Sequence, residues 1–226
     1  MPLAAARPLR WLYAAAAFLV GAALVEALVL SPPERAMGEL VRILYVHAGA
    51  AWTAYLAYVV TAVGAVMHLR SRRPLWDRVS VASAEWGVVL TTIALLTGSL
   101  WGRAAQGWWW TWDPRQTLTL MLWLLYAGYL ILRQYTSGER RATLSAVLAL
   151  AGLPTMLLNH FAVTLFRADH PPQIVVRGGG PFVDPEIFWP LALSLLAYTA
   201  LYLALLAARV DLEALRARAT LLRREA

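Results

Sequence analysis

The stretch IFWPLALSLLAYTALYLALLAA, residues 187–208, decides the fold. It runs for 22 residues without a single Asp, Glu, Lys or Arg. A membrane-spanning helix needs roughly 20 consecutive apolar residues, because that length crosses the hydrocarbon core of a bilayer. The stretch therefore predicts a transmembrane helix.

Comparable runs recur along the chain, separated by turn and charge signals such as Arg72-Arg73-Pro74 and Asp113-Pro114. The predicted spans are Trp11–Leu30, Ile43–Leu69, Val81–Trp101, Gln116–Arg133, Thr143–Phe166 and Ile187–Ala208. We expect an all-α fold, a polytopic membrane bundle with six transmembrane helices, that forms a single domain over residues 1–226.

The composition favours the same class of protein. The chain is 60% hydrophobic and 15% charged, whereas a soluble domain has about a quarter of its residues charged. Its net charge is +7 and all 20 basic residues are Arg, clustered between the spans, where they orient a membrane protein. We therefore expect the lipid bilayer, and no nucleic acid, as a partner. The absence of Cys excludes disulfides, iron–sulfur clusters and thiolate-ligated haem.

The arginine counts of alternate connections predict the orientation. The N-terminus, the second and fourth loops and the C-terminus carry 14 Arg, and the other three loops carry 6. Because positive charge marks the cytoplasmic side, both termini are expected there. Residues 101–115 and 167–186 then form the two unusual outer loops of a multi-pass membrane protein. The inner loops lack a phosphate-binding motif, so energy from ATP must come from a partner.

The outer segment 101–115, called the tryptophan loop below, is unusually aromatic. It contains Trp101, Trp108, Trp109, Trp110 and Trp112. One interpretation is an aromatic belt at the membrane interface. The other is a flat platform for a large planar ligand, because indole faces stack on extended π systems and glycines allow close backbone approach.

Charged residues in the tryptophan loop narrow the choice of planar ligand. Arg103 and Arg115 carry guanidinium forks that match carboxylates. Haem offers both a flat macrocycle and two propionates. Asp113 stands before Pro114 with Gln116 three residues on, which predicts a helix N-cap. Alternatively, Asp113 holds Arg115 or an indole N–H in place.

Histidine is the expected iron ligand. His47 lies just inside the outer end of the second span, where a polar ring is a functional candidate; the alternative is a hydrogen bond to a neighbouring helix. His160 in the fifth span and His170 in the outer loop 167–186 are both candidates for the opposite ligand, and the residues alone leave that choice open. His68, beside basic residues, is interpreted as an ordinary interfacial histidine.

The sequence resembles a known family, the haem exporter protein C (CcmC) family of WWD-motif proteins. The family's loop runs W-G-x-x-x-x-G-x-W-W-x-W-D-x-R-x-T. This chain matches it with Trp101, Gly102, Gly107, Trp109, Trp110, Trp112, Asp113, Arg115 and Thr117. The second span is similar to the family segment R-I-x-Y-x-H-x-x-x-A-W through Arg42, Ile43, Tyr45, His47, Ala51 and Trp52. A third similar segment carries Phe161, Val163, Arg167 and His170. Trp108, Pro114 and the Pro171–Pro172 pair depart from the family pattern.

The resemblance implies a non-enzymatic protein that binds haem b during cytochrome c maturation. It implies His47 and His170 as axial ligands, and Arg42, Arg103 and Arg115 as candidates for the propionates. Its expected partners are the haem chaperone CcmE and the subunits CcmA, CcmB and CcmD of an ABC-type complex. Three rival hypotheses are a bis-histidine b-type electron-transfer subunit, a permease with a tryptophan-lined gate, and a cytochrome c haem lyase relative.

Overall fold

The computed structural model describes residues 6–35, 37–166, 176–177, 180–181 and 185–225. The helices are α1 Ala6–Val25, α2 Val41–Ser71, α3 Pro74–Gln106, α4 Pro114–Gln134, α5 Gly138–Phe166 and α6 Pro185–Glu225. A π-helical turn, η1 Glu26–Leu30, extends α1. Two short strands, β1 Val176–Arg177 and β2 Gly180–Pro181, pair antiparallel between α5 and α6.

The prediction of an all-α membrane bundle is confirmed, with a helix at each of the six expected stretches. Within the described residues, five helical segments are long and apolar enough to cross a membrane: Leu9–Leu30, Val41–Ser71, Pro74–Gln106, Gly138–Phe166 and Glu186–Arg216. Helix α4 falls outside that set, although its 21 residues would extend about 30 Å. Its first two turns carry Arg115, Gln116, Thr117 and Thr119, which lower its apolar character.

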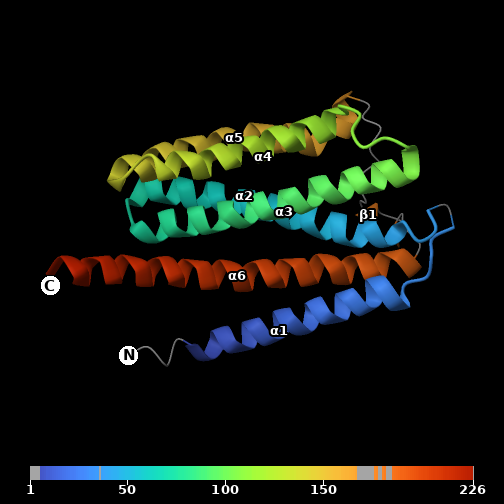
Figure 1. The fold of residues 1–226 in the computed structure, drawn as a ribbon, viewed down its shortest axis with the longest axis horizontal. Coiled ribbons are helices and arrows are strands. Elements are labelled where there is room, and N and C mark those ends of the chain that lie inside the picture. The colour runs from blue at the N-terminus through green and yellow to red at the C-terminus, as the bar shows by residue number, and fades with distance from the viewer. Residues whose placement is uncertain (1–5, 36, 167–175, 178–179, 182–184, 226) are drawn as a thin grey trace.

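Helices that follow one another in the chain run in opposite directions, whereas the packed pair α2 and α6 runs parallel (Figure 1). Helices α2 and α3 lie in the middle of the view, α4 and α5 pair on one side, and α6 and α1 lie on the other. The start of α1 and the end of α6 lie at one end of the bundle, called the terminal end below. The opposite end, called the distal end, holds the end of α3 and the starts of α2, α4 and α6.

Tyrosines fill the centre of the bundle where α2, α3, α4 and α5 meet. The rings of Tyr58 and Tyr126 stack with centroids 4.0 Å apart, and both are buried. The Tyr58 hydroxyl lies 2.6 Å from Thr91 Oγ1, so this buried polar group is satisfied. The centre is therefore well packed and forms the floor beneath the distal end.

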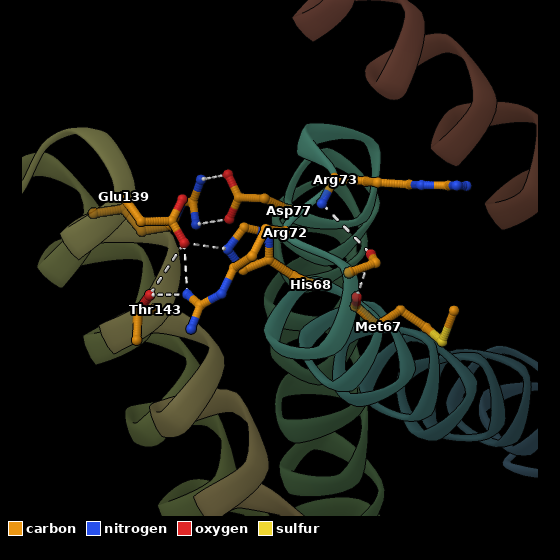
Figure 2. A network of polar contacts seen from close by, with 9 residues as sticks. Met67, His68, Arg72, Arg73, Asp77, Glu139 and Thr143 are labelled. Carbon is orange, nitrogen blue, oxygen red and sulfur yellow. Dashed lines mark hydrogen bonds and ion pairs between the residues drawn. The ribbon is translucent and has the colours of Figure 1, made fainter.

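Ion pairs tie the helices at the terminal end. The Arg133 guanidinium of α4 donates to both carboxylate oxygens of Asp77 of α3, at 2.7 and 2.9 Å. Figure 2 shows His68 of α2 and Arg72, the residue that follows α2, turned toward Glu139 of α5. The distances from His68 Nε2 and Arg72 Nη1 to Glu139 Oε1 are 3.4 and 2.6 Å. His68 stands in the last turn of α2 and is only 3% exposed. Its predicted position at the membrane interface stays a prediction, but its ring is packed inside the bundle. Its burial follows from the packing of α2 against α5, which the sequence does not display.

Candidate functional site

A cavity opens among the helices at the distal end, and its volume of about 330 Å³ lies in the usual range of ligand sites. Its walls come from the first half of α2, the last turns of α3, the connection between α3 and α4, and the first turns of α4. Met37, α5 and α6 each contribute one residue. Most lining groups are apolar. Its polar and charged lining residues include His47, Asp113, Arg115, Thr119 and Asn159. We call this space the distal cavity.

His47 is half-buried in the wall of the distal cavity. Its Nδ1 lies 3.0 Å from the Ala94 carbonyl oxygen and 3.1 Å from Thr97 Oγ1, both on α3. Gly98 allows this close fit, because a Cβ at that position would lie 3.1 Å from His47 Cε1. The two interpretations of His47 are compatible, since the ring hydrogen-bonds to a neighbouring helix and also lines a cavity. Metal-ligating histidines commonly use their second ring nitrogen in this way.

The tryptophan loop is more helical than predicted. Helix α3 continues through Trp101 to Gln106, and α4 begins at Pro114, so only residues 107–113 are non-helical. Helix α3 ends where Gly107 takes a left-handed backbone with φ 86°, and its N–H donates to the Arg103 carbonyl. Helix α3 therefore continues past the end of the predicted apolar span at Trp101, because charged Arg103 and the small residues beside it are compatible with helix.

Side-chain hydrogen bonds hold residues 107–113 in place. Asp113 Oδ1 accepts from the backbone N–H groups of Arg115 and Gln116, at 2.8 and 3.4 Å, which confirms the predicted N-cap. Pro114 occupies the first helical position, where a missing N–H costs nothing. Trp112 adopts φ 58°, an unfavourable backbone for a bulky residue. The segment is therefore a turn that leads directly into a capped helix.

The indoles do not form one flat surface. Trp101 and Trp110 line the distal cavity. Trp109 and Trp112 do not line it, and they are 59% and 70% exposed. The rings of Trp110 and Trp112 stand nearly perpendicular, at 84°. The cluster therefore divides into indoles that wall the cavity and indoles that face outward.

The three candidate arginines differ in their surroundings. Arg115 lines the distal cavity, and its Nη1 is buried without a hydrogen-bond partner among the described residues. Arg103 is exposed, and its Nη1 donates to the Gly107 carbonyl at 2.6 Å. Arg42 pairs with Glu39 at 2.6 Å and donates to the Leu28 carbonyl. Only Arg115 of these three lies in the cavity wall.

Of the two candidates for the second iron ligand, the structure describes His160 but not His170. His160 is exposed on α5 and is not among the residues that line the distal cavity. Its ring does meet the ring of Tyr55, a cavity-lining residue, edge-on with centroids 6.1 Å apart. His170, together with most of the outer loop 167–186, lies outside the described residues. The choice between them therefore stays a prediction.

Sequence reasoning missed two polar residues of the cavity wall. Asn159 of α5 is 2% exposed and donates from Nδ2 to Thr119 Oγ1 of α4 at 2.8 Å. The available signal was an uncharged polar residue inside an apolar span, which is a functional candidate in a membrane helix. The adjacent His160 carries the same signal and is a better iron ligand, which hides Asn159 in the sequence.

The fold and the cavity together define a multi-pass helical membrane protein that has an imidazole, two indoles and a buried guanidinium nitrogen around one cavity. The family profile described as Heme exporter protein C matches residues 2–225. This chain belongs to the haem exporter protein C family. It is a multi-pass membrane protein of haem transport for cytochrome c maturation.

Named relatives agree with this assignment. A heme exporter protein C of Bradyrhizobium diazoefficiens is 36% identical over 94% of this chain and 81% of its own length. That of Rhodobacter capsulatus is 33% identical over 94% and 88%. A ccmC-like mitochondrial protein of Arabidopsis thaliana, named for cytochrome c biosynthesis, is 32% identical over 72% and 61%.

Proposed function

We propose that this chain binds haem b in the distal cavity and presents it to the haem chaperone CcmE. The distal end then faces the outside of the bacterial cytoplasmic membrane, as the arginine counts predict, and both termini are cytoplasmic. The chain acts with CcmA, CcmB and CcmD in an ABC-type complex. It holds and hands over haem rather than catalysing a reaction.

The observation that carries the proposal is the convergence of three haem-complementary groups on one cavity. His47 supplies an imidazole whose Nδ1 is held by α3. Trp101 and Trp110 supply aromatic wall, and indoles pack well against a macrocycle. Arg115 supplies a buried guanidinium nitrogen that lacks a partner among the described residues, and such a group is costly unless a ligand anion meets it. These residues fit haem and its propionates.

In this proposal each residue has a distinct task. His47 ligates the iron from one side and His170 from the other, which leaves the porphyrin at the membrane surface. Arg115 binds a propionate, and Asp113 positions Arg115 indirectly by fixing the first turn of α4. Arg42 and Arg103, engaged elsewhere, contribute to propionate binding only if they exchange partners. Trp109 and Trp112 are exposed beside the cavity and provide a surface on which CcmE docks.

The rival hypotheses predict different ligands. A b-type electron-transfer subunit would place His160 in the cavity with His47, but His160 lies outside that wall. A permease without cofactor would give a colourless preparation. A haem lyase relative would carry out bond formation on a cytochrome rather than transfer to CcmE.

A transfer assay tests the proposal. The haem-loaded chain in detergent is mixed with the soluble part of CcmE, and haem is measured on each protein after separation. Transfer from the wild type and from His160→Ala, together with loss of transfer in His47→Ala, is expected. Haem that stays on the chain in the presence of CcmE contradicts the presenting role, and haem loss in His160→Ala favours electron transfer.

A further inference from the structure

The orientation of the Asn159 side-chain amide in the distal cavity is fixed by its neighbours. The Thr119 hydroxyl donates to the Arg115 carbonyl, one turn back along α4, at 2.7 Å. Because a hydroxyl has only one proton, its oxygen is left to accept from Asn159 Nδ2 at 2.8 Å. The carbonyl oxygen of the amide, Oδ1, therefore faces away from Thr119.

That oxygen is a buried acceptor without a donor. Asn159 is 2% exposed, lines the distal cavity, and its Oδ1 has no hydrogen-bond partner among the described residues. A buried acceptor left unsatisfied costs free energy, so the site favours a ligand that donates a hydrogen bond at this point. Arg115 Nη1 and Trp110 Nε1, by contrast, are unsatisfied donors in the same wall.

The charges of the cavity wall indicate which part of haem can donate a hydrogen bond to Asn159. Arg115 is the single arginine or lysine among the described residues that line the cavity. The carboxylate of Asp113 is used to cap α4. One guanidinium can balance one ionised propionate, but a second anion would be buried without a partner, which is strongly unfavourable. The carboxyl groups are the part of haem b that can carry a hydrogen-bond donor, and they do so only when protonated.

We propose that Asn159 accepts a hydrogen bond from the second carboxyl group of haem, bound in its neutral, protonated form. This inference rests on the proposed haem-binding function and deepens it. Arg115 takes the ionised propionate, and Asn159 takes the carboxylic acid. Asn159 is thus a specificity residue that distinguishes a hydrogen-bond donor from a second anion.

Haem analogues test the inference without relying on transfer to CcmE. The purified protein is titrated with haem, with haem whose two carboxyl groups are carried as primary amides, and with haem dimethyl ester. The amide carries N–H donors and the ester carries none, while both lack the ionised propionate that pairs with Arg115. The wild type should bind the amide about tenfold more tightly than the ester, the value of one hydrogen bond.

Variants then locate the preference at Asn159. In Asn159→Leu the amide and the ester should bind equally, whereas Ser145→Ala should keep the tenfold preference. Ser145 is a matched control because it is also buried on α5 with an unsatisfied hydroxyl, but it does not line the cavity. Asn159→Ser, whose side chain is shorter and has no amide oxygen, should behave as Asn159→Leu and serves if the leucine variant does not fold.

The outcomes separate this inference from the proposed function. An amide preference that survives in both Asn159 variants, or is missing in the wild type, overturns the role of Asn159. Failure of the wild type to bind any of the three porphyrins overturns haem binding itself. A purely structural role of Asn159, through its hydrogen bond to Thr119, predicts a lower melting temperature of Asn159→Leu together with an unchanged amide preference, and that result would also overturn the inference.

Discussion

Adding one methyl group at Gly98 should weaken haem binding by displacing His47. The Cβ of Gly98→Ala would lie 3.1 Å from His47 Cε1, whereas relaxed carbon contacts are about 3.5–4.0 Å. The imidazole must therefore retreat from α3 by about 0.4 Å. Its contacts with Ala94 O and Thr97 Oγ1, now 3.0 and 3.1 Å, would stretch to the limit of useful hydrogen bonds.

Losing those contacts frees the ring that is proposed to ligate iron. Disturbing the hydrogen-bond partner of a metal-ligating histidine typically costs about 10–100-fold in affinity. Because an alanine methyl is a small perturbation, we expect the lower end, about tenfold weaker haem binding. Titration of the purified protein with haem, followed by the Soret band, measures the effect directly.

Gly128→Ala is the matched control for this substitution. Gly128 lies within α4, and no atom lies within 4 Å of the place that an added methyl group would take. Alanine there should leave haem binding unchanged and favour the helix slightly. Gly98→Ala with wild-type affinity would refute the reasoning. So would a loss of the same size in Gly128→Ala.

Two further predictions follow from the contrast between buried and exposed charges. Arg115→Gln should weaken haem binding roughly 10–100-fold, the value of a charge-assisted hydrogen bond. Arg103→Gln, at an exposed position, should change the affinity far less. Equal effects of the two variants in the haem titration would contradict the propionate role of Arg115. Asp77→Ala should destabilise the protein by up to about 3–5 kcal/mol, because Arg133, whose side chain is only 10% exposed, would lose its bidentate partner. Glu139→Ala removes an ion pair whose two side chains are more than half exposed, so its melting temperature in detergent should fall much less, and a larger fall than in Asp77→Ala would argue against this ranking.

The fold could be predicted from the sequence because apolar runs of membrane length are a strong local signal. The start of α4 was predictable for the same reason, since the Asp113 cap and Pro114 are local chemistry. The apolar run indicates a span that ends at Trp101, whereas helix α3 continues to Gln106, because hydropathy falls before the helix ends. Burial of His68 also escaped prediction, since it depends on how α2 meets α5.

The site was predictable in its residue types more than in its geometry. The motif pointed to Arg103 and Arg115 alike, and only packing shows that Arg115 lines the cavity. The same applies to the indoles, where Trp110 turns inward and Trp112 outward. Asn159 carries no motif, and its importance arises from the unsatisfied oxygen that its contact with Thr119 leaves.

The central claim is that haem iron is held by His47 in the distal cavity, opposite His170. The most direct measurement is the absorption spectrum of the purified protein and of the variant in which His47 and His170 are both replaced by Ala. The wild type should show the Soret band of a six-coordinate haem, and the double variant should contain no bound haem. A double variant with an unchanged Soret band would contradict the claim.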